Sequence, residues 1–590
     1  MKISLTGPPL PPVTSTSIAQ ALERASAVGH SSGLLLLDAR EHEEPVSWGE
    51  LRQRARRLAA ALMERGIMPG DRVAMVLPTG ADFLTAFFGT VLAGATPVPL
   101  YPPVRLARLA EYTRSTSRML SVSGASLVLT DRRLNLLLGP ALEATPPPLG
   151  CATVAELSGR SNEAERTVDP EGLGLIQFSS GSTVDPKPVA LTHRALMAQC
   201  AALKALMPLP ADSSETGVSW LPLYHDMGLI GCLLLALYWP GSLLLIPPEL
   251  FLARPALWLR ALSRTRATIS PAPNFAYGLC LKRIRDEDLE GVDLSHWRYA
   301  LNGAEPVSAS IVERFSRRFA PYGFRPEALM PVYGLSEASL AVTFTSPEGP
   351  KRVVSVDPSV LAREHRVVPG PRSIVSVGSP VPGVELEVRS ESPLDEPGQV
   401  GRIYVRGPSV MREYFGDAEA TAQALLGGWL DTGDLGFIDR EELFICARAK
   451  DLVIIRGANH SPQEFEECVE GLEGVRAGCV VAMGFVPPGS DEESLLVLVE
   501  TTPSVPVNLE ERLRAAIVER TNVRPHTVEL LAPGTLPRTS SGKLRRGEAL
   551  RLYQAHALLA PPPVTVFSLS KEVARSALAH ARRALARRSP

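Results

Sequence analysis

The chain lacks a dominant charge and lacks any ordered set of cysteines. Its 590 residues carry a formal net charge of −2, with acids and bases interspersed, which excludes a chain-wide nucleic-acid or anionic-membrane footprint. The seven cysteines are scattered, odd in number and without Cys-x-x-Cys or zinc-ligand spacing. We therefore expect a reduced, cytoplasmic protein that binds no nucleic acid and has no disulfide framework.

Long uninterrupted apolar segments are lacking as well. Residues 1–12 contain no apolar core of the length that a signal peptide needs. One apolar run, 228–248, is cut by Pro240-Gly241, whereas a single helix needs about 20 residues to cross a bilayer. This run predicts a buried helix, a turn and a buried strand, and no transmembrane span.

Short apolar strands alternate with amphipathic helices over the first 340 residues. Such alternation predicts a parallel sheet covered on both faces and therefore an α/β fold. The strands are expected at 72–77, 95–100, 127–130, 243–246, 267–270 and 298–302.

Two changes of composition divide the rest of the chain. Prolines, glycines and charges dominate from 345, and strands with period-two alternation follow from 376. A compact α+β stretch begins near 448. We predict a large domain over 1–447 with a β-rich part at about 376–447, a smaller domain over 448–553, and a tail over 554–590.

The tail is basic and has apolar residues at helical spacing between 571 and 588. A basic amphipathic helix can dock on an acidic partner or on a membrane surface. The alternative is a solvated terminal helix, which we favour.

The most informative stretch is Phe178–Lys187, Phe-Ser-Ser-Gly-Ser-Thr-Val-Asp-Pro-Lys, which follows an apolar strand. It offers hydroxyls, exposed backbone N–H groups and one cation, which are the groups that hold a polyphosphate. The Gly-x-x-x-x-Gly-Lys-[Ser/Thr] spacing of a Walker loop is absent. Alone, the stretch is equally compatible with an ordinary surface loop.

Further segments follow it in a fixed order: Tyr224-His-Asp-Met-Gly, Asn302-Gly-Ala-Glu-Pro, Tyr333-Gly-Leu-Ser-Glu, Trp429-Leu-Asp-Thr-Gly-Asp, Arg448-Ala-Lys-Asp and Thr539-Ser-Ser-Gly-Lys. From about residue 20 to 553, this ordered set resembles the adenylate-forming superfamily of acyl-CoA synthetases, nonribosomal-peptide adenylation domains and luciferases. The stretches 97–103, 273–277 and 456–460 resemble its fatty acyl-AMP ligase subgroup in particular.

The resemblance implies an AMP-binding adenylation domain of two αβα subdomains and a small β-barrel-like subdomain, followed by a mobile α+β lid. It also implies the subgroup's insertion, here about 345–375, which hinders the motion that admits coenzyme A. The implied reaction joins a fatty acid and ATP to give acyl-AMP and pyrophosphate, with Mg²⁺. The acyl group would then pass to the phosphopantetheine of a separate acyl carrier protein.

Residue roles follow from the same resemblance. Lys543 would bridge the carboxylate and the α-phosphate, His225 would stand beside the acyl channel, and Lys450 would be the hinge. Mg²⁺ would be held by Thr183 and Glu337. ATP would be bound by Ser179, Ser180, Gly181, Ser182, Thr183, Lys187, Gly303, Ala304, Glu305, Tyr333, Gly334, Leu335, Ser336, Asp434 and Arg448. The acyl channel would be lined by Asn274, Phe275 and Tyr277.

Each of these residues also has a purely structural interpretation. The structural alternative is a core aromatic for Tyr333, a turn residue for Asp434 and a structural histidine at a helix start for His225. Two positions depart from the superfamily pattern. Pro188 replaces the glycine after the loop lysine and stiffens the loop exit, and Ala447 replaces a glycine and narrows the backbone options at the hinge.

Three alternative functions stay open at this point. The nearest is a long-chain acyl-CoA synthetase that uses coenzyme A as acceptor. A degenerate scaffold that binds nucleotide or acyl groups without turnover is the second. The segment 334–338 loosely resembles the nucleophile turn of a serine hydrolase, which is the third.

Overall fold

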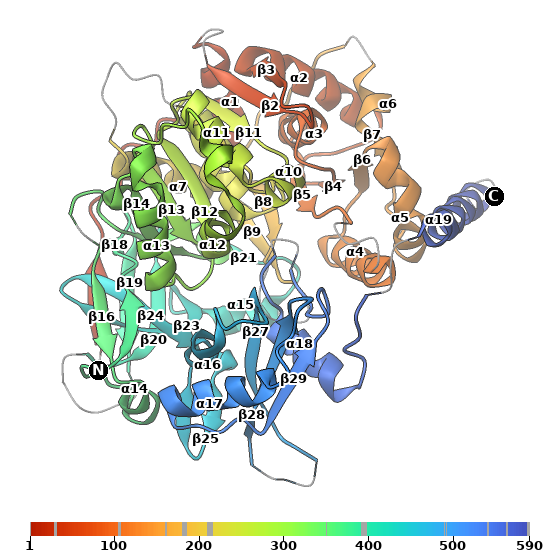
Figure 1. Cartoon of the computed structure of the whole chain (residues 1–590). Helices are drawn as coiled ribbons and strands as arrows, with labels where there is room; N and C mark the ends of the chain where they lie inside the picture. Colours follow the sequence, from red (N-terminus) through yellow and green to blue (C-terminus); the bar gives the residue numbers. More distant parts are fainter. Residues whose placement is uncertain are drawn as a thin grey trace.

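The protein has a large domain, which runs from red through green to cyan in Figure 1, and a smaller lid domain, which follows in blue; the blue terminal helix lies apart from the lid domain. The structure is a computed structural model and describes residues 2–28, 32–103, 108–159, 162–179, 186–208, 216–349, 351–390, 398–488, 490, 492–539, 542–561 and 565–586.

The first subdomain is a parallel sheet of order β5-β4-β6-β7 with helices packed against it. Strands of a sheet that is covered on both faces are apolar throughout, and β5 is buried at every position. The hydroxyl of Ser47 caps α2 by accepting from the N–H of Glu50. The elements are α2 Trp48–Glu64, β4 Arg72–Val76, α3 Ala81–Leu92, β5 Thr96–Leu100, α4 Leu109–Ser123, β6 Leu127–Thr130, α5 Arg132–Ala144, β7 Cys151–Thr153 and α6 Val154–Ser158.

The second subdomain is a nine-stranded sheet of order β18-β15-β14-β13-β12-β10-β11-β2-β3. Its six central strands are parallel, and antiparallel strands close both edges. The elements are α1 Ile18–Ser26, β2 Gly33–Leu37, β3 Glu43–Ser47, α7 His193–Leu206, β10 Thr216–Ser219, β11 Ser242–Leu245, α10 Pro248–Ala253, α11 Ala256–Arg264, β12 Ile269–Pro273, α12 Asn274–Arg283, β13 Tyr299–Gly303, α13 Ala309–Phe319, β14 Leu329–Gly334, β15 Ala341–Phe344 and β18 Ser379–Pro380.

The apolar run 228–248 lies inside this subdomain, and the prediction of a buried helix, a turn and a buried strand is confirmed. The helical part runs from α8 (Asp226–Gly228) through a π-helical turn (Leu229–Leu234) into α9 (Leu235–Tyr238), and β11 is the strand. The π-helical turn was not expected from the sequence. Among the described residues, no helix combines the length and the apolar character that crossing a bilayer requires.

The third subdomain is an antiparallel sheet in which β1 (Lys2–Thr6) from the very start of the chain pairs with β19. No pattern in the sequence predicted this long-range pairing. The other elements are β19 Glu385–Arg389, β20 Gly401–Arg406, α15 Ala418–Ala424, β22 Leu425–Leu426, β23 Trp429–Asp439 and β24 Glu442–Arg448. The segment predicted to be an insertion contains β16 Val353–Val356, α14 Pro358–Glu364 and β17 Arg372–Val375. A three-stranded sheet of β8 Leu173–Phe178, β9 Pro188–Thr192 and β21 Glu413–Tyr414 carries the predicted phosphate loop between its first two strands.

The lid domain follows β24 and has its own apolar core. A single 3-10 turn, Ala449–Asp451, connects it to the large domain. Its elements are β25 Val453–Ile455, β26 Ala458–His460, α16 Pro462–Val469, β27 Val475–Phe485, β28 Ser494–Thr501, α17 Leu509–Thr521, β29 Thr527–Leu531 and α18 Arg546–Gln554.

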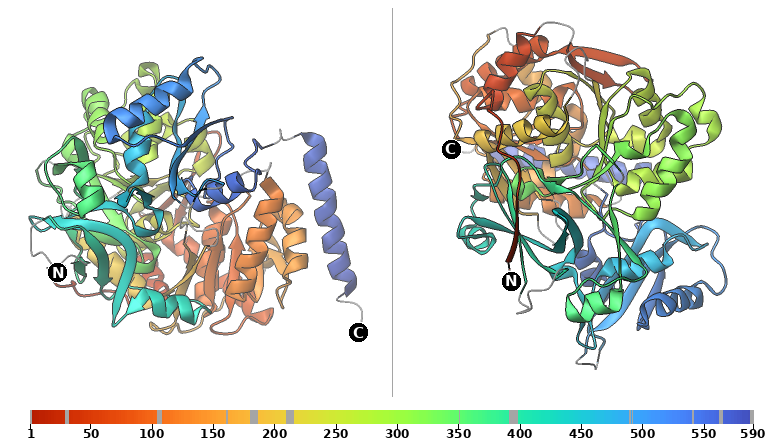
Figure 2. Two further views of the ribbon diagram at one scale, coloured as in Figure 1. Left: turned by 90° about the horizontal axis from the view of Figure 1, so that it is seen from below. Right: turned by 90° about the vertical axis from the view of Figure 1, so that its left-hand side faces the viewer.

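The C-terminal helix α19 (Val566–Ala586) packs on α5, so the favoured prediction of a solvated terminal helix is wrong. Ser576 is fully buried, and its hydroxyl accepts from the N–H of Gly139 at 2.9 Å. A Cβ on Gly139 would lie 2.3 Å from the carbonyl oxygen of Ser576, so the close approach of the two helices requires glycine. Figure 2 (left) shows α19 beside the orange helices of the first subdomain, across from the lid domain that precedes it in the chain.

Candidate active site

One continuous cavity of about 3380 Å³ lies where the two domains meet. It gathers most of the residues predicted to act together, although they are spread over more than 360 positions of the chain. Those that line it are Ser179, Lys187, His225, Asn274, Phe275, Ala304, Glu305, Tyr333, Gly334, Leu335, Ser336, Glu337, Asp434, Arg448, Lys450 and Lys543. Ser180, Gly181, Ser182 and Thr183 lie outside the described residues.

Two predicted residues do not line the cavity. Tyr277 is completely buried, donates its hydroxyl to the carbonyl of Leu301 at 3.0 Å, and packs its ring against Trp258; it is a core residue and not part of an acyl channel wall. Gly303 lies at the end of β13, where a Cβ would come 2.8 Å from a methyl carbon of Val332. Close packing of β13 against β14 accounts for this glycine.

The side of the cavity that is predicted to bind the nucleotide centres on Asp434. One carboxylate oxygen accepts from the hydroxyl of Tyr333 at 2.7 Å, and the other accepts from the Nε of Arg448 at 3.1 Å. Burial and the neighbouring Asp434 charge raise the pKa of Tyr333 well above its ordinary value, which keeps the hydroxyl a donor. Asp434 and Arg448 are paired across β23 and β24, so the sheet register itself brings them together.

The backbone restriction that we expected from alanine at position 447 is not seen in the structure. This residue lies within β24 opposite Leu435, where extended backbone suits alanine as well as glycine. The turn that carries Lys450 begins two residues later. Burial and the charge of Arg448 lower the pKa of Lys450.

A hydrogen-bonded network that sequence reasoning missed joins two of the predicted motifs. Asp226 lies between His225, whose Nδ1 is 2.6 Å from one carboxylate oxygen, and Ser336, whose hydroxyl donates to the other at 2.5 Å. Burial by itself raises the pKa of the Asp226 carboxyl, but the contacts with His225 and Ser336 and the charge of Lys543 hold that pKa well below its usual range. The only available signal was its position directly after His225.

The same network argues against a serine hydrolase. In such enzymes the histidine takes the proton of the serine hydroxyl, and the carboxylate lies behind the histidine. Here the hydroxyl of Ser336 is directed at the carboxylate of Asp226. The order of groups is therefore wrong for nucleophile activation.

Lys543 enters the cavity from the lid domain on a short loop. The N–H of Thr539 donates to the carbonyl of Lys543 at 2.7 Å, and the N–H of Lys543 donates to the hydroxyl of Thr539 at 3.0 Å. Gly542 has a φ of 92°, which the turn requires and glycine allows. Burial lowers the pKa of the Lys543 ammonium group, and the carboxylates of Asp226 and Glu305 act in the opposite direction.

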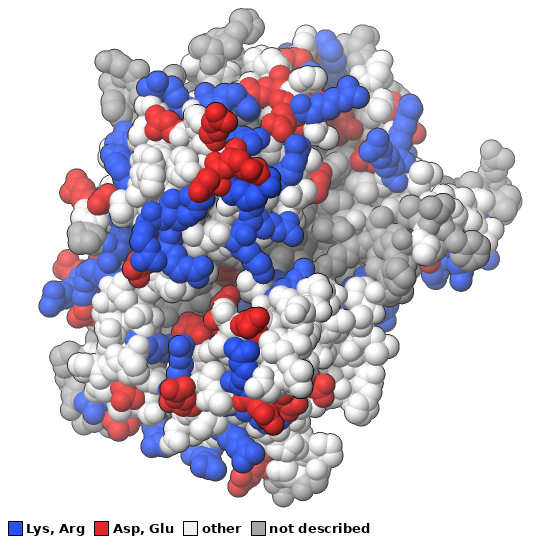
Figure 3. All heavy atoms as spheres, viewed as in Figure 1, with Lys and Arg blue, Asp and Glu red and all other residues white. Residues whose placement is uncertain are grey.

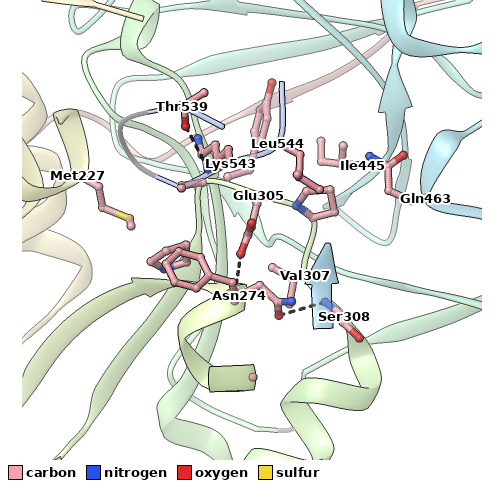
Figure 4. A pocket seen from close by; sticks show the side chains of 18 of the residues that line it. Met227, Asn274, Glu305, Val307, Ser308, Ile445, Gln463, Thr539, Lys543 and Leu544 are labelled. Carbon is pink, nitrogen blue, oxygen red and sulfur yellow. Dashed lines mark hydrogen bonds between the residues drawn. The ribbon is translucent and has the colours of Figure 1, made fainter. Parts of the chain in front are cut away.

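Figure 4 shows Lys543 above Glu305, with Asn274 below them. Glu305, predicted to bind nucleotide, accepts from the N–H of Phe275 at 2.5 Å and so caps α12. Burial raises its pKa. Asn274 accepts from the side chain of Asn302 at 3.2 Å and from the N–H of Ser308 at 3.3 Å, which fixes the loop between β13 and α13.

One arm of the cavity is apolar. Its walls come from α7, from α9, from α12 and from loops beside them, and Trp220 in this wall stacks on Phe251 with ring centroids 3.9 Å apart. The apolar lining residues include Leu203, Met207, Trp220, Leu221, Leu235, Phe275, Leu279 and Leu340. Such an arm suits an aliphatic chain.

The edge of the predicted phosphate loop also lies in the cavity. The N–H of Ser179 donates to the carbonyl of Lys187 at 2.9 Å, and the Nζ of Lys187 lies over the ring of Tyr414 at 4.4 Å. Tyr414 in turn donates its hydroxyl to Glu337 at 2.8 Å. Pro188 is the first residue of β9, and its carbonyl accepts from the N–H of Phe415 at 2.8 Å. The restricted backbone of this proline is therefore accommodated at the start of a strand.

The predicted insertion contacts the lid domain directly. The side chain of Arg372 lies 3.8 Å from Glu467 and 3.5 Å from the hydroxyl of Ser461. The ring of His365 lies 3.0 Å from the amide nitrogen of Asn459. Two guanidinium nitrogens of Arg372 are buried without a hydrogen-bond partner, so the contact leaves part of the guanidinium group unsatisfied.

Comparison with known proteins shows which family this chain belongs to. The AMP-binding enzyme family matches residues 24–415. A putative acyl-CoA synthetase of Caulobacter vibrioides is 36% identical over 562 residues, 91% of this chain and 95% of the relative. The medium-chain-fatty-acid–[acyl-carrier-protein] ligase JamA of Moorena producens is 34% identical, over 85% of this chain and 88% of its own.

A solved structure from a study of fatty acyl-adenylate ligases of E. coli and L. pneumophila superimposes with a TM-score of 0.85 at 32% identity, over 93% of this chain and 99% of the other. The chain therefore belongs to the AMP-binding enzymes, the adenylate-forming superfamily. Within that superfamily it falls in the fatty acyl-AMP ligase subgroup.

Proposed function

We propose that the protein activates a fatty acid with ATP to give acyl-AMP and pyrophosphate, and then passes the acyl group to the phosphopantetheine thiol of a separate acyl carrier protein. The observation that supports this above all is the single cavity, which joins a nucleotide-type wall around Asp434, an apolar arm and the ammonium group of Lys543. The name of JamA agrees with both the substrate and the acceptor, and the fatty acyl-adenylate ligases agree with the substrate. The Caulobacter relative is instead named for coenzyme A as acceptor.

In the first half-reaction a carboxylate oxygen of the fatty acid forms a bond to the α-phosphorus. The bond from that phosphorus to the oxygen bridging to the β-phosphate breaks, and pyrophosphate leaves. Negative charge grows on the α-phosphoryl oxygens, and a preorganised cation stabilises it best in an enclosed site. Lys543 supplies that cation, while Asp434, oriented by Tyr333 and Arg448, accepts hydrogen bonds from the ribose hydroxyls.

The residues present fit a magnesium ion at the phosphate edge. Glu337 offers a carboxylate at Tyr414, whose ring Lys187 covers, and Thr183 is the second proposed oxygen ligand. Among the described residues no group of three or more His, Cys, Asp or Glu side chains could hold a metal, so most ligands would come from phosphates and water. When bound, Mg²⁺ neutralises phosphate oxygens and favours departure of pyrophosphate.

In the second half-reaction the thiolate of the acceptor attacks the acyl carbonyl carbon and AMP leaves. The contacts of Arg372 and His365 with the lid domain favour a carrier protein over coenzyme A as acceptor. They tie the predicted insertion to the domain whose rotation about Lys450 would admit coenzyme A.

Mass spectrometry of the products from a panel of fatty acids tests the proposal. We expect acyl-AMP from ATP and a fatty acid alone, acyl transfer when a holo-acyl carrier protein is added, and little acyl-CoA when coenzyme A replaces it. Efficient acyl-CoA formation would favour a long-chain acyl-CoA synthetase. Absence of acyl-AMP and of ATP–pyrophosphate exchange with every acid would favour the catalytically degenerate scaffold.

A further inference from the structure

The mouth of the cavity has a strongly basic side. Lys282 and Arg283 end α12, and Arg314 and Arg317 lie on the neighbouring helix α13; all four are exposed and line the cavity. We call these four residues the basic rim. Figure 3 shows the cations of this region gathered beside the cleft between the two domains.

The basic rim is poorly neutralised by its own neighbours. Within the described ranges, no ion pair joins Lys282, Arg283 or Arg314 to an acid, and Arg317 has only an exposed pair with Glu313 at 3.4 Å. The nearby acids are engaged by arginines outside the rim: Asp286 by Arg318, and Glu287 and Asp288 by Arg285.

Two acids on the facing lid domain have partners of their own, although Glu470 also interacts with Arg314 of the rim. Glu466 forms a pair with Arg546 at 2.7 Å, and Glu470 accepts from the N–H of Gly478 at 3.2 Å. Burial raises the pKa of Glu470, an effect that Arg314 partly opposes. The rim therefore presents a positive field to solvent at the entrance to the site, which is the arrangement that steers a negatively charged partner.

We propose that the basic rim is the docking surface for the acidic face of a carrier protein, an inference that rests on the proposed function. A folded carrier cannot enter the cavity, so it must stop at the mouth while its phosphopantetheine arm reaches inward. Carboxylates around the attachment point, and the phosphate of the arm, would meet α12 and α13.

The test compares a double charge reversal, Arg283→Glu with Arg314→Glu, with the matched control Arg132→Glu with Arg133→Glu. The control arginines are exposed residues of α5 that do not line the cavity. The probes are an acidic holo-acyl carrier protein, the same carrier in its apo form, and free pantetheine.

We expect the rim variant to weaken binding of the apo carrier about tenfold or more at low salt, and to raise the KM for the holo carrier by a similar factor. Acyl-AMP formation without acceptor and transfer to free pantetheine should match the wild type. The control variant should behave as the wild type in every assay, and added salt should remove most of the difference.

Three results would overturn the inference. Carrier binding unchanged by the rim reversal, or lost equally in the control, would show that docking lies elsewhere. Slower acyl-AMP formation in the rim variant would show that the rim acts on closure of the lid domain. A wild type that makes acyl-AMP but binds no apo carrier would remove the docking surface altogether. By contrast, carrier binding without transfer would contradict the proposed function, but it would still support the basic rim as the docking surface.

Discussion

The two sides of the cavity hold their functional groups in different ways. On the large domain, Asp226 at the start of α8 and Asp434 in the middle of β23 are buried, and each contacts two side chains. On the lid domain, Lys543 stands on a loop fixed chiefly through Thr539. The large-domain side is preorganised before substrate binds, whereas the lid-domain side can be delivered and withdrawn, as two half-reactions in one site require.

The largest expected effect comes from removing the group that the lid domain delivers. Lys543→Ala should lower the rate of acyl-AMP formation about 10²–10³-fold, because the cation that meets the developing phosphoryl charge is lost. ATP–pyrophosphate exchange measures this, and Lys571→Ala, an exposed lysine of α19, is the control. A rate close to that of the wild type would show that the lid-domain side contributes no chemistry.

On the large-domain side, Asp434→Asn tests whether the carboxylate that Tyr333 and Arg448 hold in place binds the nucleotide. The substitution keeps the shape but removes the charge held by Tyr333 and Arg448. Since a hydrogen bond to a charged group contributes about 1.5–3 kcal/mol, the KM for ATP should rise about 10- to 100-fold. The KM for the fatty acid should stay near the wild-type value; an equal rise in both would contradict the assignment of this wall to the nucleotide.

Asp226→Asn tests the network with His225 and Ser336, and its effect depends on pH. A carboxyl whose pKa is lowered in the folded protein stabilises the fold above its unfolded pKa of about 4 and loses that contribution as pH falls. The variant should be less stable than the wild type at pH 7, and the gap should narrow below about pH 4. Chemical denaturation across this range measures the gap. A constant gap at all pH values would show that only packing was lost.

The insertion offers a smaller effect that connects the two sides. Arg372→Met should leave acyl-AMP formation within about twofold and increase transfer to coenzyme A severalfold, because the contact with Glu467 and Ser461 no longer restrains the lid domain. A double-mutant cycle with Glu467→Gln separates this contact from local damage. No coupling in the cycle would mean that the insertion does not restrain the lid domain.

The smallest effect is expected at the C-terminal helix. Gly139→Val should displace Ser576 and release α19 from α5. The lost hydrogen bond should lower the free energy of unfolding by about 1 kcal/mol, and activity should change little. Faster tryptic cleavage at Arg575 reports the release. Ala577→Leu, at an exposed position of the same helix, is the control and should cleave like the wild type.

Local patterns in the sequence predicted many of the strands of this protein and the superfamily to which it belongs. The apolar strands at 72–77, 127–130 and 298–302 were expected because their neighbours in sequence already specify burial, and they appear as β4, β6 and β13. The ordered motifs likewise indicated the superfamily, because a phosphate loop, an acidic turn and a lysine loop are each short and self-contained.

Other features were decided only by contacts between distant parts of the chain. Asp226 acquires its partner Ser336 from 110 positions away, and Tyr277 is drawn into an aromatic core and away from the cavity. The strand β1 joins β19, and α19 returns to α5. Periodicity and propensity describe a residue's neighbours along the chain, whereas these outcomes depend on how sheets and helices pack after the backbone has brought remote segments together.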